Sequence, residues 1–339
     1  MNVALTSYCN QKCLYCFGSD AMSFGRNTQD GREISAKNLN KVMGFMKKSG
    51  VSIFNMIGGE PTLHSKFEGV YDTISDNGFS VMLFSNGIID ERRVEFLRKK
   101  DNLVDILINI NHPKDYSSKH WAMVNNALSR LNKKITLSFR VYELNFDPRF
   151  LFELIDKYKL MRLINWAIAC PSLIKDNIYI KLEDHEKVIK RMVRFSRESK
   201  KRNIRWYSDS GFISCAFGNG KLKELYHNIG FKPVINCLPP IEVSPNLRVF
   251  RCLGLAPKSH PDLKLTDFKN LGEAERYFFV KSLPFKKIGG MDRCFKCKDL
   301  ISGKCGGGCL VHILKKFPDY KNLPPIFDTK RPRLQKISC

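Results

Sequence analysis

Residues 1–16 have the sequence MNVALTSYCNQKCLYC, in which three cysteines follow directly on a short apolar run. The apolar run predicts a first β-strand, and the loop after it carries Cys9, Cys13 and Cys16. Three thiolates from one loop can hold one face of a four-iron cluster and leave the last iron without a protein ligand. An iron with an open position can bind a substrate or cofactor, the feature that separates catalytic from structural metal sites. This stretch therefore predicts a reactive iron–sulfur site at the end of the first strand.

Downstream of this loop, strand-like and helical segments alternate through the first half of the chain. The predicted strands are residues 1–5, 51–57, 79–84, 104–110, 135–142 and 163–169. The predicted helices are residues 35–48, 67–77, 91–99, 119–131 and 149–158, followed by a basic helix over 182–201. Repeated strand-then-helix units imply parallel, right-handed connections. Six units are two short of a closed eightfold barrel, so we expect an α/β fold with a partial (β/α)6 TIM-like barrel.

After about residue 200 the pattern changes to short segments interrupted by glycine, proline and cysteine. We expect two domains, the barrel over residues 1–200 and a smaller cysteine-rich α+β domain over 201–339. Within the second, residues 241–243 and 248–251 flank Ser244-Pro245-Asn246, which is typical of a β-hairpin turn.

The composition is that of a folded protein with an excess of positive charge. Of 339 residues, 43% are hydrophobic and 27% are charged, which excludes wholesale disorder and fibrous repeats. No run of 18 apolar residues occurs, and the segment before Cys9 is too short for a signal peptide, so we expect a cytoplasmic protein without a membrane partner. The net charge of +24 favours acidic partners such as nucleic acid, an acidic peptide, a phosphorylated small molecule or an anionic membrane surface. A solvated basic surface without a binding role explains the charge equally well.

A second group of cysteines lies near the carboxyl end. Cys294 and Cys297 are followed by Cys305 and Cys309 with a glycine-rich spacer, a pattern that suits either an iron–sulfur cluster or a structural zinc site. The remaining cysteines could complete two four-cysteine sites with this group, and they are Cys215, Cys237, Cys252 and Cys339. Cys170, alone at the end of the sixth predicted strand, is interpreted as a small buried apolar residue, with a role near a cluster as the alternative.

The spacing C-x3-C-x2-C with Tyr15 before the last cysteine resembles the radical S-adenosylmethionine (radical SAM) enzymes. Gly58-Gly59-Glu60-Pro61, after the second strand, is similar to the family segment that contacts the methionine amino group of the cofactor. Ser85-Asn86 after the third strand resembles a segment near the cofactor, and Ser138 and Arg140 on the fifth strand resemble positions that bind its carboxylate. After the fourth strand the family pattern is replaced by Asn109-Ile-Asn111-His112-Pro113, where His112 is either a substrate-facing group or a hydrogen-bonded loop histidine.

The carboxyl-terminal half resembles the SPASM extension of this family and its shorter relative, twitch, which carry auxiliary [4Fe–4S] clusters. The resemblance implies one or two such clusters. It assigns Cys237, Cys252, Cys309 and Cys215 to the first, and Cys294, Cys297, Cys305 and Cys339 to the second. Two departures are visible: seven residues separate Cys297 from Cys305 where the family usually has five, and Leu247 stands where a hairpin glycine is usual.

The resemblance implies reductive cleavage of S-adenosylmethionine to a 5′-deoxyadenosyl radical, which abstracts a hydrogen atom from the substrate. A flavodoxin- or ferredoxin-type protein would supply the electron, and no residue is singled out as the catalytic acid or base. The expected substrate is an acidic peptide or a protein side chain, and the alternative is an anionic sugar or other small metabolite. A different class, a basic metal-stabilised nucleic-acid-binding protein, would need exposed aromatics along a basic stripe, whereas the aromatics here are interspersed with apolar strand residues.

Overall fold

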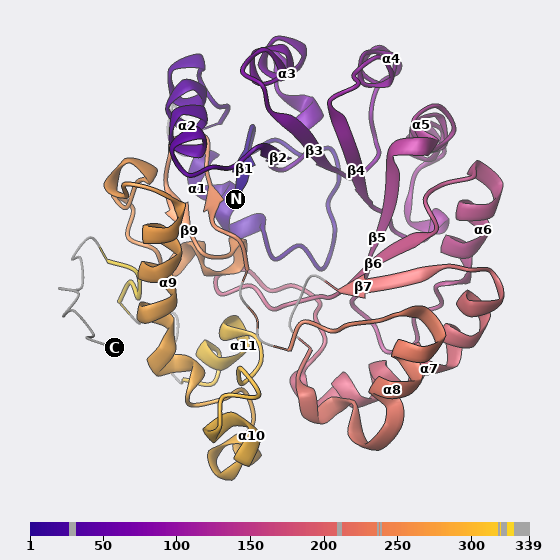
Figure 1. Ribbon diagram of the computed structural model, residues 1–339, viewed down its shortest axis with the longest axis vertical. Helices are drawn as coiled ribbons and strands as arrows, with labels where there is room; N and C mark the ends of the chain where they lie inside the picture. Colours follow the sequence, from indigo (N-terminus) through magenta and orange to yellow (C-terminus); the bar gives the residue numbers. More distant parts are fainter. Residues whose placement is uncertain are drawn as a thin grey trace.

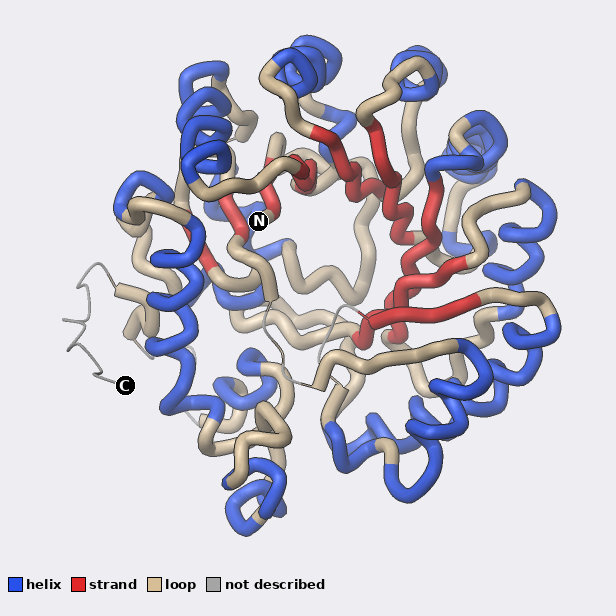
Figure 2. Tube along the Cα trace, viewed as in Figure 1, coloured by secondary structure: helices blue, strands red, loops and turns tan. Residues whose placement is uncertain are grey.

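The core of the protein is a curved, mostly parallel sheet with helices on its outer face (Figures 1 and 2). The computed structural model describes residues 1–26, 32–208, 212–235, 237, 239–317, 319 and 324–328. Within these residues the strands follow the order β7-β6-β5-β4-β3-β2-β1-β8-β9, and every neighbouring pair is parallel except β8 with β9. The strands are β1 (Asn2–Ala4), β2 (Ile53–Ile57), β3 (Ser80–Ser85), β4 (Leu103–Asn109), β5 (Ile135–Val141), β6 (Leu163–Ile168), β7 (Arg205–Ser208), β8 (Glu242–Val243) and β9 (Val249–Phe250).

Because β7 and β9 are the two ends of this order, the sheet is an open, partial barrel, as the sequence predicts. The helices are α1 (Ser19–Arg26), α2 (Ala36–Lys48), α3 (Phe67–Asp76), α4 (Glu91–Arg98), α5 (Ser118–Arg130), α6 (Arg149–Tyr158), α7 (His185–Lys201), α8 (Gly218–Ile229), α9 (Leu271–Lys286), α10 (Lys298–Ile301) and α11 (Leu310–Leu314). None of the helices in the described ranges is both long enough and apolar enough to cross a membrane.

Local sequence explains where several of the outer helices begin. The side chains of Ser35, Asp90 and Ser117 each accept a hydrogen bond from a backbone N–H in the first turn of α2, α4 and α5, respectively. Such caps satisfy donors that have no partner inside the helix. The apolar faces of these helices pack on the sheet, and this leaves the carboxyl ends of the strands free to carry loops with chemical function.

The six predicted strands and the helices between them are confirmed, but the sheet extends further than expected. β7 lies beyond residue 200 and pairs with β6, and β8 pairs with β1, so the carboxyl-terminal part adds strands at both ends of the barrel sheet. β7 was missed because its short sequence, RWYS, lacks a clear apolar pattern. The segment after residue 200 is therefore built onto the barrel sheet.

The predicted hairpin over residues 241–251 is present, and its turn shows how Leu247 can stand where a glycine is usual. Leu247 has φ of 66°, the left-handed conformation that favours glycine, and its N–H donates to the carbonyl of Ser244 at 2.9 Å. Its side chain is buried in the core. Burial of the leucine side chain therefore offsets the backbone strain at this position.

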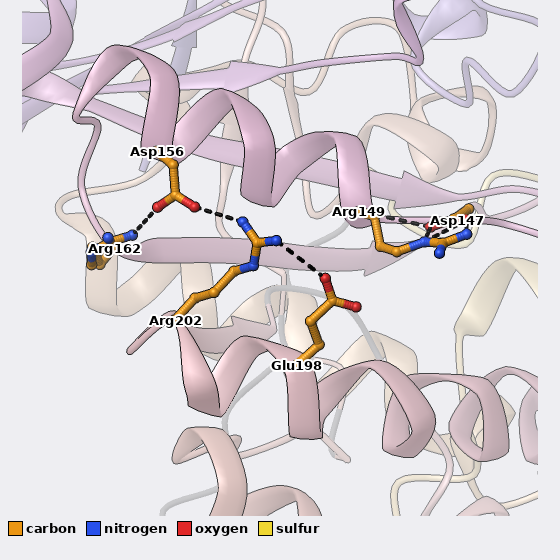
Figure 3. A network of polar contacts seen from close by, with 6 residues as sticks. All are labelled: Asp147, Arg149, Asp156, Arg162, Glu198 and Arg202. Atoms are coloured by element: carbon orange, nitrogen blue, oxygen red, sulfur yellow. Dashed lines mark hydrogen bonds and ion pairs between the residues drawn. The ribbon is translucent and has the colours of Figure 1, made fainter.

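A polar network on the outer surface joins α6 to the end of α7 (Figure 3). Asp156 accepts hydrogen bonds from Arg162 at 2.7 Å and from Arg202 at 2.6 Å, and Arg202 also pairs with Glu198 at 3.5 Å. These hydrogen bonds lower the pKa of Asp156. Because the side chains are partly exposed, each pair contributes only about 0–1 kcal/mol, so part of the basic excess is neutralised with little effect on stability.

A buried carboxylic acid at the β1–β8 junction makes stability depend on pH. Burial raises the pKa of Glu242 from 4.5 to about 7, while a hydrogen bond from Asn2 at 3.1 Å opposes the rise. Since the folded protein holds this proton more tightly than the unfolded chain, stability falls as pH rises from about 4.5 through about 7. We expect Glu242→Gln to raise the free energy of unfolding at pH 8 by up to about 3 kcal/mol and to change it little at pH 4.5. Urea unfolding at both pH values checks this, and equal effects at the two would contradict it.

Candidate functional site

The cysteine loop after β1 lies at the carboxyl edge of the sheet, beside the loops that follow β2, β3 and β4. The backbone N–H of Cys16 donates to the carbonyl of Cys13 at 3.1 Å, which turns the loop back on itself. Asn86, after β3, approaches the sulfur of Cys9 at 3.7 Å, and Asn111, after β4, approaches that of Cys13 at 4.0 Å. The fold thus brings the three thiols together beneath amide groups from two other loops.

The three thiols are partly buried, and the charge of Lys175 acts on one of them, Cys16. Burial raises the pKa of Cys9, Cys13 and Cys16, to about 11 for Cys13, and repulsion from Cys16 adds to the rise for Cys9 and Cys13. Backbone N–H groups of Gln11, Gly18 and Ser19 act in the opposite direction. A cationic metal centre binds cysteines as thiolates, and backbone N–H groups around the sulfurs stabilise those thiolates. The donor set therefore fits an iron–sulfur cluster.

The glycine pair after β2 lets the backbone pass against the cysteine loop. A β-carbon at Gly59 would lie 2.2 Å from the carbonyl oxygen of Tyr8 and 3.0 Å from the β-carbon of Cys9. The N–H groups of Gly59 and Glu60 donate to the carbonyls of Thr6 and Tyr8 at 2.9 and 2.7 Å. Only glycine permits this approach, which holds the two loops in fixed register.

Glu60 is fully buried and its carboxylate is bound by protein groups. It accepts hydrogen bonds from the N–H of Asn86 at 2.8 Å, from both the N–H and hydroxyl of Thr62 at 3.2 and 2.7 Å, and from the hydroxyl of Ser85 at 3.1 Å. Burial raises the pKa of Glu60, and these donors lower it. The sequence suggested that this carboxylate faces a cofactor ammonium group. In the structure it joins the loops after β2 and β3, and Pro61 begins the short 3-10 turn beside it.

Tyr15 connects the cysteine loop to the segment after β4. Its hydroxyl accepts a hydrogen bond from Asn109 at 2.9 Å and donates one to the side-chain oxygen of Asn111, and its ring stacks on Tyr142 at 4.8 Å. His112 accepts from the N–H of Lys114 at 3.3 Å, which agrees with its interpretation as a hydrogen-bonded loop histidine. The departure from the family pattern after β4 thus supplies the two asparagines that hold Tyr15.

We expect Tyr15→Phe to leave the iron content unchanged and to lower the free energy of unfolding by about 1–2 kcal/mol, since two buried hydrogen bonds are lost. Tyr142→Phe is the matched control, because it keeps the ring stack and removes only an exposed 3.4 Å contact with Asp115. Iron analysis and urea unfolding of both variants check this. Equal destabilisation of the two would show that the asparagine contacts contribute nothing.

A row of polar side chains crosses three adjacent strands inside the barrel. Asn109 on β4, Ser138 on β5 and Asn165 on β6 are register partners. In the described part of the chain, Asn109 Oδ1, Ser138 Oγ and Asn165 Oδ1 are buried and have no hydrogen-bond partner. Unpaired buried polar atoms are costly, so such a row indicates a place where a polar ligand binds. The sequence analysis identified Ser138 but missed Asn165, whose only signal was that a polar residue occurs within a buried strand. The guanidinium carbon of Arg140, two residues after Ser138, lies 6.0 Å from the centre of the Phe17 ring.

The carboxyl-terminal cysteines form two groups that differ from the expected ones. Cys237, Cys252 and Cys309 line one small cavity. Interaction between the thiols of Cys170 and Cys309 lowers the pKa of Cys309 to about 7 and raises the pKa of Cys170 well above its usual range, and the Cys170 thiol donates to the carbonyl of Ile168 at 3.5 Å. Burial raises the pKa of Cys252, and repulsion from Cys309 and Cys237 adds to the rise. Cys170 therefore lies with this group, although the sequence favoured an isolated buried residue.

Cys215 lies with the other group. Arg293 donates to its sulfur at 3.4 Å, and its pKa is raised by burial and by the charges of Cys305 and Cys294. The family resemblance assigned Cys215 to the group of Cys237 and Cys252, since a resemblance in spacing does not show which loops meet. Cys297 follows Cys294 by one short turn, and its N–H donates to the carbonyl of Cys294 at 3.1 Å. Cys339 lies outside the described residues.

Across the described ranges, no three His, Cys, Asp or Glu side chains are arranged to hold a single metal ion. A [4Fe–4S] cluster is larger than a single ion, and four thiols are its usual donor set.

Comparisons with known proteins agree with this site. Residues 3–141 match the model of the radical SAM superfamily. Curated relatives include a probable GTP 3′,8-cyclase of Methanococcus vannielii, 26% identical over 146 residues (42% of this chain and 48% of the relative). A GTP 3′,8-cyclase of Mannheimia succiniciproducens is 25% identical over 175 residues, half of each chain. This chain spans about half the length of these curated relatives.

Two solved structures resemble the fold over most of the chain. Streptococcus suis SuiB bound to S-adenosylmethionine has a TM-score of 0.63 at 15% identity, covering 98% of this chain and 75% of SuiB. Native anSMEcpe with bound AdoMet has a TM-score of 0.60 at 18% identity, covering 91% of this chain and 88% of anSMEcpe. At these identities the likeness concerns the fold.

A partial barrel with a three-cysteine loop after its first strand defines a class of protein that holds an iron–sulfur cluster at the carboxyl edge of the sheet. The part of the chain that matches the radical SAM superfamily, residues 3–141, carries this cysteine loop; members of that superfamily use S-adenosylmethionine and a catalytic [4Fe–4S] cluster.

Proposed function

We propose that the protein is a radical SAM enzyme that modifies a peptide or protein side chain. Cys9, Cys13 and Cys16 would ligate the catalytic cluster. When bound, the cluster and S-adenosylmethionine would supply a 5′-deoxyadenosyl radical able to abstract a hydrogen atom from the substrate. The observation that carries this proposal is the convergence of three thiols and their N–H donors at the carboxyl edge of the barrel.

The chain's own residues would bind and orient the cofactor. Ser138, Asn109 and Asn165 offer unpaired polar oxygens inside the barrel, within reach of the cysteine loop through the Asn109–Tyr15 hydrogen bond. Glu60 would act as a positioning residue, because it holds Ser85 and Asn86, and Asn86 lies against Cys9. Gly58 and Gly59 would allow the backbone to reach both the cofactor and the cysteine loop. Arg140, on the same strand as Ser138, would pair with the cofactor carboxylate.

The carboxyl-terminal cysteines would hold auxiliary [4Fe–4S] clusters. Cys215 is proposed to join Cys294, Cys297 and Cys305 in one site, because its sulfur lies against Arg293 and beside Cys294 and Cys305. The group around Cys237, Cys252 and Cys309 would form a second site. Ligation of a cluster by Cys339 stays a prediction. A SPASM- or twitch-type role for this region rests on these cysteines and on the similarity to SuiB and anSMEcpe over both halves of the chain.

A peptide substrate is supported by charge and by exposed apolar side chains. SuiB, which resembles this chain over nearly its whole length, also has a structure bound to its precursor peptide SuiA. Leu14 in the cysteine loop is 69% exposed, and its carbonyl accepts a hydrogen bond from Ile178, which is 46% exposed. Exposed apolar residues beside an active site suit an extended ligand, and the charge of +24 suits an acidic one.

An anionic small metabolite is the second candidate, because the curated relatives are named GTP 3′,8-cyclases. The similarity to these relatives covers at most half of this chain. It therefore cannot include both the barrel and the carboxyl-terminal cysteines. A cytoplasmic location and a flavodoxin- or ferredoxin-type donor are part of the proposal, since a strong reductant is needed.

The test is to incubate the anaerobically reconstituted, dithionite-reduced protein with S-adenosylmethionine and either GTP or a panel of synthetic acidic peptides. We expect 5′-deoxyadenosine to form and an acidic peptide to change in mass, while its charge-neutral counterpart stays unmodified. Conversion of GTP without any peptide modification would favour the small-metabolite alternative. Absence of 5′-deoxyadenosine in every arm would overturn the proposal.

A further inference from the structure

Four cysteines from distant parts of the sequence meet beside the barrel. Cys237, Cys252 and Cys309 line one cavity, and the thiol of Cys170, which follows β6, interacts with the thiols of all three. The segment after β6 thus contributes a thiol to a group that otherwise belongs to the carboxyl-terminal part.

Packing between two segments enforces this meeting. The ring of Tyr179 lies 5.4 Å from that of His312 on α11, and Lys315 Nζ lies 5.2 Å above the Tyr179 ring. A β-carbon at Gly308 would lie 3.4 Å from Leu182. Residues 170–182 therefore rest against the start of α11, where Cys309 is the N-cap residue.

The surroundings of the four thiols suit an anionic metal cluster. Arg251 and Lys286 line the same cavity, and Lys286 donates to the carbonyl of Cys237 at 2.5 Å. In the described structure Arg251 Nη1 is buried without a hydrogen-bond partner. A buried, unpaired guanidinium donor next to several thiols indicates a missing acceptor, and the sulfides and thiolates of a [4Fe–4S] cluster are acceptors of this kind.

The group also lies next to the cysteine loop of the barrel. Asn177 donates to the carbonyl of Tyr15 at 3.2 Å and to that of Cys170 at 2.9 Å. A β-carbon at Gly254 would lie 3.4 Å from Phe17 on one side and 3.1 Å from Val311 on the other. Direct packing therefore connects the two cysteine sites.

We propose that Cys170, Cys237, Cys252 and Cys309 are the four ligands of one auxiliary [4Fe–4S] cluster, with Cys170 supplied by the barrel. This inference rests on the proposed radical SAM function and extends it. Four protein thiolates leave no open iron, so this cluster would exchange electrons and would not bind the substrate. Because Cys170 and the cysteine loop share Asn177, the cluster is placed to accept an electron from the active site.

The test uses a Cys9/Cys13/Cys16→Ala background, purified and reconstituted without oxygen, so that only auxiliary iron is measured. We expect Cys170→Ala to alter the EPR spectrum of the reduced clusters and to remove up to about four irons. If Cys170 and Cys252 hold the same cluster, Cys170→Ala/Cys252→Ala should lose no more iron than Cys252→Ala alone. Cys170→Ala/Cys294→Ala should lose iron from both sites, which makes Cys294 the matched control.

Unchanged iron, sulfide and EPR spectrum in Cys170→Ala would overturn the inference, as would a colourless background protein with stoichiometric zinc. Circular dichroism of each variant separates loss of a ligand from loss of fold. Failure of the proposed function has a different signature, since it is measured as absent 5′-deoxyadenosine in the protein that retains Cys9, Cys13 and Cys16.

Discussion

Replacing Cys9, Cys13 and Cys16 together by alanine is expected to abolish formation of 5′-deoxyadenosine under dithionite. The three thiols belong to one loop, whereas each proposed auxiliary site takes four thiols, so only this loop would leave an iron open to S-adenosylmethionine. The iron content should fall by about four per chain, the content of one [4Fe–4S] cluster. Chromatographic assay of 5′-deoxyadenosine and colorimetric iron analysis measure the two effects.

The matched control is Cys294/Cys297/Cys305→Ala, which removes the same number of thiols from the other end of the chain. It should lose a similar amount of iron while still cleaving S-adenosylmethionine. If the first triple variant continues to form 5′-deoxyadenosine, the catalytic cluster has been assigned to the wrong cysteines.

Glu60→Gln is expected to weaken S-adenosylmethionine binding by roughly tenfold to a hundredfold and to lower the free energy of unfolding by about 2–4 kcal/mol. The substituted amide would present N–H groups to Thr62, Ser85 and Asn86, which already donate hydrogen bonds at this position. The loop after β3 would then loosen, and with it Asn86 beside Cys9. The iron content should remain unchanged, because Glu60 does not touch the thiols.

Equilibrium dialysis with S-adenosylmethionine and urea unfolding check this expectation. Glu68→Gln is the control, since Glu68 is an ordinary surface partner of Arg92 at 2.8 Å and its loss should cost less than about 1 kcal/mol. Wild-type stability and affinity in Glu60→Gln would show that the buried network does not position the site.

The barrel was predictable because its signals are local. Residues 135–141, ITLSFRV, alternate apolar and polar side chains as a strand does, and the segments on either side have the amphipathic pattern of helices. Consecutive units of strand and helix connect almost always with the same right-handed sense. The cysteine loop and the glycine pair at Gly58 and Gly59 were equally visible, since their chemistry depends on residue types a few positions apart. β7 escaped detection because a short strand with arginine and tyrosine acquires its identity only by pairing with β6.

The direction of the Glu60 carboxylate and the partners of Tyr15 could not be obtained from sequence. Both depend on loops after different strands, which meet only when the sheet forms. For the same reason Asn165 was overlooked: its importance comes from lying beside Ser138 in register, and register is a property of the folded sheet.

The sequence by itself determined the α/β class, the partial barrel and the three-cysteine loop, because the apolar periodicity and the cysteine spacing act over short stretches of chain. The grouping of the distant cysteines was decided only by tertiary structure. Cys170 meets Cys309 because the segment after β6 packs against α11, and Cys215 meets Cys294 and Cys305 instead of Cys237. Metal-binding groups are defined by distances in space, and contacts between residues far apart in the sequence leave no trace in local spacing.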